Sequence, residues 1–214
     1  MRSTEPGLGR RGILFIVSGP SGAGKSSLSD WVLENMPELV LSVSMTTRAR
    51  RAGERDGEHY HFVGAGRFDQ LVADGGLAEW AEVHGHRYGT PKEPIEEARA
   101  HGRDVLLDID VHGAKQIRSA YADAVSVFLL PPSREALATR LATRGTDSEE
   151  TVRRRLDNAC REIRALSSYD YVIVNDVLET TCQTFGSIVA GQRASVARLD
   201  PDKIESLVRS FEGG

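Results

Sequence analysis

The sequence has few cysteines, no long apolar run and no excess of positive charge, and each shortage excludes a class of protein. Its two cysteines, Cys160 and Cys182, form neither a Cys-x-x-Cys pair nor a metal-ligand spacing. This favours free thiols in a reducing compartment over a disulfide framework, and we expect a cytoplasmic protein. No apolar stretch is as long as a membrane span, and the N-terminus lacks the apolar segment of a signal peptide.

The net charge also limits the kinds of partner that we expect the protein to bind. The chain has 27 Lys and Arg against 31 Asp and Glu, a formal net charge of −4. Surfaces that bind nucleic acid or anionic membranes are basic, so we expect neither partner. The remaining composition, 40% apolar and 27% charged over 214 residues, predicts a single globular domain.

The strongest chemical signal follows the first apolar run. Residues 13–17 are Ile-Leu-Phe-Ile-Val, typical of a buried parallel strand, and residues 19–26 are Gly-Pro-Ser-Gly-Ala-Gly-Lys-Ser. A strand, a glycine-rich loop and a helix start form the context of a phosphate-binding loop. In such a loop Lys25 contacts the β- and γ-phosphates and Ser26 ligates Mg²⁺. The motif arises by chance in about 1% of chains of this length, so we favour the functional interpretation.

Strand-like and helix-like segments alternate along the rest of the chain, which predicts an α/β fold with a parallel sheet covered on both faces. Two period-two segments, 58–63 and 77–83, and a turn at 88–91 predict a small antiparallel insert over about 44–91. The expected core strands are 13–17, 39–43, 105–110, 125–130 and 171–175, and the expected later helices are 93–101, 133–143, 148–167, 180–196 and 200–211.

Three constellations have a chemical and a simpler interpretation. Ser44, Arg48, Arg51, Tyr60 and Tyr88 suit a doubly charged phosphate, although a solvated basic loop would look the same. Glu79, with Ser44 and Thr90, could accept from N1–H and the amino group of guanine and repel adenine, or it could lie on the solvent face of a strand. Arg140, Arg144 and Arg155 could close over a transferring phosphoryl group, or pair with neighbouring acidic residues on helix surfaces.

Two further features concern metal ions. Asp108 ends an apolar run, as does the acidic residue that bonds the Mg²⁺ shell in phosphate-loop enzymes. The pairs His59/His61 and His84/His86 lack a cysteine or carboxylate at ligand spacing, so we interpret them as exposed strand residues.

Read together, these stretches resemble the guanylate kinase family over about residues 12–176. The motifs that carry the resemblance are Ser-Gly-Pro-Ser-Gly-Ala-Gly-Lys-Ser at 18–26, Ser-Met-Thr-Thr-Arg-x-x-Arg-x-Gly-Glu at 44–54, Gly-Glu-His-Tyr at 57–60, Glu-Trp-Ala-Glu-Val at 79–83, Tyr-Gly-Thr at 88–90, Leu-Asp-Ile-Asp at 107–110, Pro-Pro-Ser at 131–133, Arg-Gly-Thr at 144–146 and Ile-Val-Asn-Asp at 173–176. The chain departs from the family pattern at Arg50, Arg87 and Val111-His112.

The resemblance implies a five-stranded parallel sheet, a small mixed GMP-binding insert at 44–91, a helical lid at 140–159, a core of 12–43, 92–139 and 160–214, and a flexible tail at 1–11. It implies ATP and Mg²⁺ as cofactors and GMP, with dGMP, as substrate. The implied substrate-binding residues are Ser44, Arg48, Arg51, Tyr60, Glu79, Tyr88, Thr90 and Asp108. The implied ATP-binding residues are Gly19, Pro20, Ser21, Gly22, Ala23, Gly24, Lys25, Ser26, Ser27, Arg144 and Asn175; Lys25, Arg48, Arg140, Arg144 and Arg155 are the implied catalytic group, and Ser26 and Asp108 the metal ligands.

Two alternatives remain open from the sequence. A guanylate-kinase-like module that binds proteins would typically lack the loop lysine, and Lys25 is present here. A kinase for another nucleoside monophosphate would share the phosphate-binding loop but not a guanine-recognising Glu79.

Overall fold

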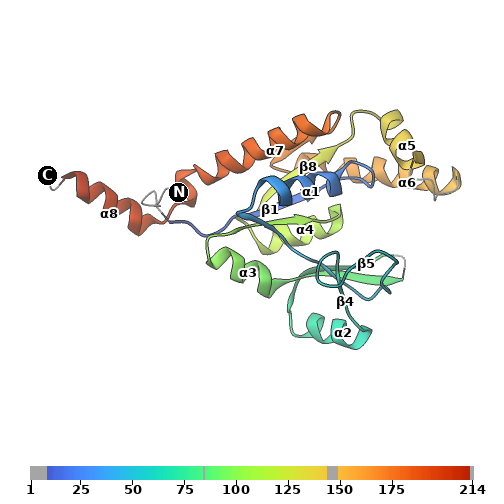
Figure 1. The fold of residues 1–214 in the computed structure, drawn as a ribbon, viewed down its shortest axis with the longest axis horizontal. Helices are drawn as coiled ribbons and strands as arrows, with labels where there is room; N and C mark the ends of the chain where they lie inside the picture. Colours follow the sequence, from blue (N-terminus) through green and yellow to red (C-terminus); the bar gives the residue numbers. More distant parts are fainter. Residues whose placement is uncertain (1–8, 84, 144–148, 213–214) are drawn as a thin grey trace.

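The computed structural model describes residues 9–83, 85–143 and 149–212. Its central element is a parallel sheet in the order β2-β7-β1-β8-β9, which confirms the predicted five-stranded sheet. The strands are β1 (Leu14–Ser18), β2 (Leu39–Leu41), β7 (Asp104–Asp108), β8 (Val125–Leu130) and β9 (Tyr171–Val174). Parallel neighbours need crossover connections, and helices supply them here (Figure 1).

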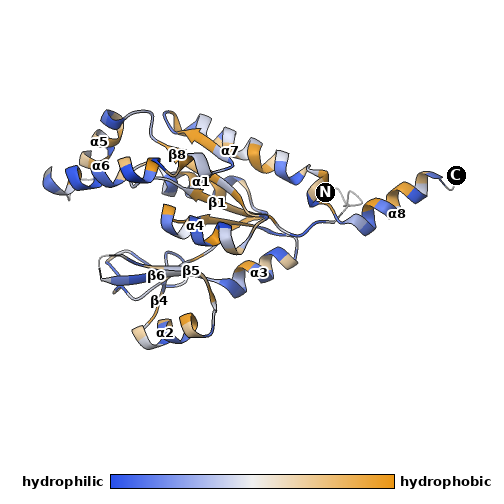
Figure 2. Ribbon diagram, turned by 180° about the vertical axis from the view of Figure 1, so that it is seen from behind, coloured by the Kyte–Doolittle hydropathy of each residue, from blue (hydrophilic) through white to orange (hydrophobic). Residues whose placement is uncertain are grey.

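Helices cover both faces of this sheet because the residues of β1 alternate between two cores. Phe15 and Val17 pack in the cluster that contains residues of α1 (Lys25–Asn35) and α7 (Leu178–Arg193). Leu14 and Ile16 pack in the opposite cluster, with residues of α3 (Lys92–Ala100) and α4 (Val111–Ala120). Figure 2 shows the hydrophobic strands lying between these helices.

Helix α4 has no counterpart among the helices expected from the sequence. It begins directly after β7, and the Asp110 side chain caps it by accepting a hydrogen bond from the Gly113 backbone N at 2.7 Å. A glycine in the first turn weakens the helical signal, since glycine has a low helix propensity. Tertiary packing of Ala114 and Ile117 overrides that propensity.

A second, four-stranded sheet has the order β4-β3-β6-β5. Its strands are β3 (Met45–Thr46), β4 (His61–Phe62), β5 (Leu77–Val83) and β6 (His86–Pro91), and α2 (Ala65–Ala73) lies between β4 and β5 in the chain. The β3–β4 pair is parallel and the other pairs are antiparallel, so this sheet is mixed. The turn predicted at 88–91 is wrong: these residues belong to β6, where pairing with β5 and β3 on both sides holds the backbone extended.

Helices α5 (Arg134–Thr143) and α6 (Glu149–Ile163) pack on each other through Leu137, Leu141 and Ala159. Figure 1 places them and the second sheet at the same end of the molecule. At the opposite end α8 (Pro201–Glu212) projects from the body, and none of its residues is buried. Two short 3₁₀ helices, Leu166–Ser168 and Val196–Arg198, complete the described elements.

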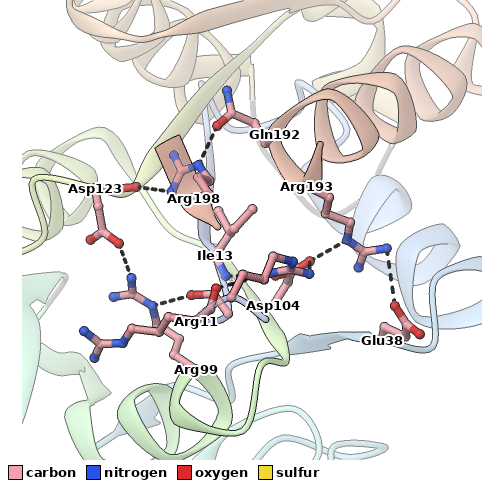
Figure 3. Close-up of polar contacts among 11 residues, drawn as sticks. Arg11, Ile13, Glu38, Arg99, Asp104, Asp123, Gln192, Arg193 and Arg198 are labelled. Atoms are coloured by element: carbon pink, nitrogen blue, oxygen red, sulfur yellow. Dashed lines mark hydrogen bonds and ion pairs between the residues drawn. The ribbon is translucent and has the colours of Figure 1, made fainter. Parts of the chain in front are cut away.

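A buried carboxylate, that of Asp104, joins the segment before β1 and helix α7 to the sheet (Figure 3). Asp104 is fully buried and accepts hydrogen bonds from the Ile13 backbone N at 2.8 Å, from Arg10 at 2.5 and 3.0 Å, and from Arg193 Nε at 2.7 Å. Arg99 lies nearby and bonds the Gly12 carbonyl and Asp123. Residues 1–8 of the expected tail lie outside the described residues.

Both cysteines are free thiols, as the sequence predicts, with Cys160 exposed and Cys182 buried. In the part of the chain that the structure describes, no helix is long and apolar enough to cross a lipid bilayer.

Candidate active site

The glycine-rich loop joins the end of β1 to the start of α1. Gly19, Gly22 and Gly24 have φ values of 143°, 89° and 100°, which L side chains rarely adopt. A Cβ at Gly19 would lie 2.2 Å from the Leu129 carbonyl oxygen, so this position also needs glycine for close backbone contact. These φ values suit a concave loop, and within it the Ala23 N donates to the Pro20 carbonyl at 3.0 Å.

A pocket opens over this loop. The Lys25 Nζ lies at the loop and donates to the Gly19 carbonyl at 2.8 Å. The pocket is lined by Gly19, Ser21, Gly22, Gly24, Lys25, Ser26, Ser27, Asp110 and Glu162. Seven of the eleven predicted ATP-binding residues thus line one pocket, together with two carboxylates, those of Asp110 and Glu162.

A neighbouring pocket lies on the other side of the loop, between Gly22, Gly24, Ser27, Arg140, Asn175, Asp176 and Leu178. The buried Asn175 amide braces the loop by donating to the Ala23 carbonyl at 2.7 Å, while its oxygen accepts from Thr181 at 3.0 Å. Arg140 donates to the Asn175 carbonyl at 2.8 Å. The structure therefore brings Asn175 and Arg140 together beside the loop.

A third pocket lies between the two sheets and is lined by Ser44, Tyr60, Glu79, Ala81, Tyr88, Asp108, Ile109 and Asp110. Its most unusual member is Glu79, which is only 7% exposed. The register of β5 and β6 sets Glu79 opposite Thr90, and the buried Thr90 hydroxyl donates to Glu79 Oε1 at 2.6 Å. The simpler interpretation of Glu79, a solvent-facing strand residue, is excluded by this burial.

Burial also changes the chemistry of Glu79. Loss of hydration raises the pKa of its carboxyl to about 7; the Thr90 hydrogen bond opposes this rise and the nearby Asp110 charge adds to it. A buried carboxylate with one hydroxyl partner still has acceptor capacity. The pocket therefore presents a carboxylate suited to a planar ligand with two adjacent N–H donors.

The basic stretch forms an anchored arginine site beside this pocket. The Arg48 guanidinium is 9% exposed and forms a two-pronged ion pair with Glu54, at 3.0 and 2.7 Å. It also lies 5.6 Å from the centre of the Tyr60 ring. The hydrogen bond from Arg48, with a second from the Arg51 backbone N at 2.7 Å, lowers the pKa of Glu54 to about 2. The simpler interpretation of a wholly solvated basic loop therefore does not hold for Arg48, although Arg51 itself is exposed.

Two residues of the site were missed in the sequence. Glu54 had a signal, since it is the first acidic residue after the basic stretch at 48–51, yet only its partly buried pairing with Arg48 shows its role. Asp110 lines both the loop pocket and the pocket between the sheets. The sequence indicated Asp110 through the alternating pattern Leu-Asp-Ile-Asp at 107–110, because this pattern places two carboxylates at the same end of β7.

Asp108 lies close to residues of both the pocket between the sheets and the loop pocket. It lines the pocket between the sheets and accepts from the Ser29 hydroxyl at 3.4 Å. Burial raises its pKa, and the Lys25 charge opposes that rise. Asp108 is therefore close enough to the phosphate-binding loop for the Lys25 charge to affect its pKa.

Of the two remaining predicted arginines, only Arg155 lies within the described residues. Arg155 lies on α6 and is partly buried, and Arg144 falls outside the described residues. No group of three or more His, Cys, Asp or Glu within the described ranges is placed to hold a metal ion. His59 instead accepts from the Arg55 backbone N at 3.1 Å, and His84 lies outside the described residues.

Comparison with known proteins gives one consistent family. The family model described as guanylate kinase matches residues 11–192. The guanylate kinase of Syntrophotalea carbinolica is 50% identical over 190 residues, covering 89% of this chain and 90% of that protein. That of Sphingopyxis alaskensis is 50% identical over 188 residues, covering 87% and 84%. The crystal structure of guanylate kinase from Anaplasma phagocytophilum superimposes with a TM-score of 0.77 at 34% identity, covering 93% of this chain and 96% of that one.

Proposed function

The chain belongs to the guanylate kinase family, and from that premise we propose how its residues divide the transfer of a phosphoryl group from ATP to GMP. The enzyme is an ATP:GMP phosphotransferase whose products are ADP and GDP. The comparisons lend no support to a non-catalytic protein-binding module or to a kinase for another nucleoside monophosphate.

One observation carries the assignment of residues. The loop pocket and the pocket between the sheets share Asp110, so a ligand in one faces a ligand in the other. We assign ATP to the loop pocket and GMP to the pocket between the sheets. This arrangement brings two phosphate groups together without a covalent protein intermediate, and positioning of that kind supplies much of the catalysis in phosphoryl transfer.

Guanine recognition falls to Glu79 and its neighbours. The carboxylate accepts from guanine N1–H and the exocyclic amino group, and Thr90 holds it in place. Ser44 and Asp108 line the same pocket, and Asp110 extends it toward the loop. Adenine has an acceptor at N1, so binding it would leave the buried carboxylate facing a lone pair at a high desolvation cost.

The GMP phosphate is assigned to Arg48 and Arg51, with the hydroxyls of Tyr60 and Tyr88. Arg48 is already oriented by Glu54, so it loses little conformational freedom when the phosphate binds. None of these groups contacts the ribose 2′ position in this assignment, and dGMP is therefore expected as a second substrate.

The donor site uses the loop backbone, Lys25, and the arginines of the lid. Backbone N–H groups of the loop at 19–26, other than Pro20, and the Lys25 side chain hold the ATP phosphates, and Asn175 braces the loop beside them. Arg140, Arg144 and Arg155 lie in three places along α5, the connection and α6. We propose that these helices move over ATP as a lid (140–159), that 44–91 moves as a GMP-binding unit, and that 12–43, 92–139 and 160–214 stay as the core.

The residues present fit a Mg²⁺ ion. Ser26 supplies a hydroxyl in the loop pocket and Asp108 and Asp110 supply nearby carboxylates, which are the hard oxygen groups that Mg²⁺ prefers. Bound Mg²⁺ would neutralise charge on the ATP phosphates. The scarcity of protein ligands is expected, since Mg²⁺ in such sites keeps waters and phosphate oxygens. We also propose a cytoplasmic location and a role in purine nucleotide metabolism.

The test is turnover of ATP with a panel of acceptors, AMP, CMP, UMP, GMP and dGMP, measured as ADP release by a coupled assay. The proposal expects kcat/KM for GMP and dGMP to exceed that of the other three by orders of magnitude. Comparable turnover of UMP or AMP would contradict the guanine assignment.

A further inference from the structure

Gly113 lies at a position where glycine is unfavourable unless something requires it. It is the third residue of α4, and glycine in a helix costs stability relative to alanine. Its φ is not in the left-handed region, since Gly113 is absent from the positive-φ glycines of the described chain. The helix backbone therefore gives no reason for glycine at this position.

A neighbouring functional side chain does give a reason. A Cβ on Gly113 would lie 2.9 Å from Glu79 Oε2, 3.2 Å from Glu79 Cδ and 3.5 Å from Asp110 Oδ1. The other glycines in described helices are not crowded in this way: nothing lies within 4 Å of a Cβ at Gly66 or Gly191, and at Gly186 the nearest atom is 3.8 Å away. Only at Gly113 does the missing side chain make room for a carboxylate.

We propose that Gly113 is a specificity-determining residue: by lacking a side chain, it lets the Glu79 carboxylate lie against the first turn of α4 in the orientation that accepts from guanine. The inference rests on the proposed role of Glu79. It adds that α4, an element of the core, sets the position of a base-recognising group carried by the second sheet.

A methyl group at 113 would displace Glu79 and leave the fold in place. The crowded atoms are the end of a flexible side chain, so moving them costs the fold little. Glu79 cannot move without effect on binding, because Thr90 holds its other oxygen at 2.6 Å in a buried setting. Displacement must therefore weaken the Thr90 hydrogen bond or turn the carboxylate away from the base.

The experiment compares Gly113→Ala with Gly191→Ala, a matched helical glycine in α7 whose Cβ would meet nothing. Gly191→Ala should melt no lower than the unsubstituted protein, because alanine favours helix, and Gly113→Ala should melt within a few degrees of it, because the same gain offsets the weakened Thr90 hydrogen bond. Gly113→Ala should lower kcat/KM for GMP by about tenfold or more, the loss of one good hydrogen bond, mainly through KM. Its KM for ATP and all parameters of Gly191→Ala should change less than about twofold.

A double-mutant cycle separates positioning from a general packing effect. Glu79→Asp withdraws the carboxylate by about 1.5 Å, one carbon–carbon bond, which relieves the contact with a methyl group at 113. Glu79→Asp should therefore be more harmful alone than in the Gly113→Ala background, an interaction between the two sites. Strictly additive effects would overturn the proposal.

Two other results would also overturn it: equal GMP kinetics for Gly113→Ala and Gly191→Ala, or a loss by Gly113→Ala that extends to the melting temperature and to ATP. Glu79→Gln, measured alongside, distinguishes this failure from failure of the guanine assignment. If Glu79→Gln loses GMP activity and Gly113→Ala does not, only the role of Gly113 falls; if neither loses activity, the Glu79 assignment falls as well.

Discussion

At the scale of single residues, the site depends on carboxylates that orient other groups. Glu54 accepts from the Arg48 guanidinium with both oxygens and from the Arg51 backbone N. It therefore fixes the side chain of Arg48 and the main chain of Arg51, the two arginines that we assign to the GMP phosphate. A negative charge next to a phosphate site opposes binding by itself, so its benefit must come from orientation.

We predict that Glu54→Gln raises the KM for GMP by about tenfold, because a neutral amide cannot accept two charged hydrogen bonds from Arg48. The KM for ATP should not change. The matched control is Glu58→Gln, which removes an exposed partner of Arg55 in the same stretch and should leave both KM values near those of the original protein. Equal effects of the two substitutions would show that Arg48 needs no orientation.

The raised pKa of Glu79 gives a second residue-scale prediction. Only the ionised carboxylate accepts both guanine N–H groups, and its pKa in the empty site is about 7. As pH falls below 7, kcat/KM for GMP should therefore fall about tenfold per unit. The GMP phosphate also titrates in this pH region. The control is therefore the pH profile of Glu79→Gln, which should lack the part of the decrease in kcat/KM that protonation of the Glu79 carboxyl causes. Identical pH profiles for the original protein and Glu79→Gln would contradict the assignment of Glu79 to guanine recognition.

The raised pKa of Glu79 also determines the direction in which the stability of the folded protein changes with pH. The folded-state pKa of Glu79 lies above the ordinary value of 4.5, so the folded protein retains a proton that the unfolded chain releases. Between pH 4.5 and 7 the burial of Glu79 therefore lowers the stability of the empty protein as pH rises. Bound guanine offsets this cost by pairing the charge.

At the scale of elements, the sequence predicted the central strands well and some of the surrounding elements poorly. Residues 13–17 are a continuous apolar run, and residues 125–130 are apolar except for Ser126; both segments form buried strands of the sheet. The Tyr-Gly-Thr-Pro segment at 88–91 looked like a turn because glycine and proline are common in turns. Pairing of β6 with two neighbours outweighs that local preference, and no local pattern reports it.

Asp104 gives the clearest prediction at this scale. It joins β7 to the segment before β1 through Arg10 and Ile13, and to α7 through Arg193 (Figure 3). Asp104→Asn should lower the free energy of unfolding by about 2–3 kcal/mol, since it removes the buried charge that pairs with two partly buried arginines. Urea unfolding measures this change. Glu205→Gln, in an exposed pair with Arg209, is the control and should have little effect.

Retention of full stability by Asp104→Asn would show that water satisfies these arginines. The sequence could not have predicted the cluster, because Arg10, Asp104 and Arg193 are about 90 residues apart in the chain and meet only in the folded sheet.

At the scale of the whole molecule, the pocket that we assign to GMP lies between two sheets. Glu79 and Arg48 come from the second sheet and its flanking stretch, whereas Asp108 and Asp110 come from the end of a core strand. Motifs predicted most of these residues one by one, through the family resemblance. That Asp110 lines both pockets, and that the absence of a Cβ at Gly113 leaves room for Glu79, depends on how the sheets pack, which motif spacing does not encode.

Helix α8 lies outside this arrangement. It leaves the body at the end opposite the site, has no buried residue, and contributes to none of the three site pockets. We predict that a chain ending at Asp200 keeps kcat/KM for GMP and ATP within about twofold and its melting temperature within a few degrees. Steady-state kinetics and thermal unfolding test this. A large loss of activity would show that α8 acts on the site.

The central claim is that Glu79 recognises guanine in an ATP-dependent GMP kinase, and the ratio of kcat/KM for GMP to that for AMP tests it most directly. Glu79→Gln retains the shape of the side chain but presents an amide N–H₂ to a donor edge of the base. The loss for GMP should be about 2–4 kcal/mol, while AMP, whose N1 accepts, should lose far less. The GMP/AMP ratio should therefore narrow by orders of magnitude, with the KM for ATP unchanged. An unchanged ratio in Glu79→Gln would contradict the account.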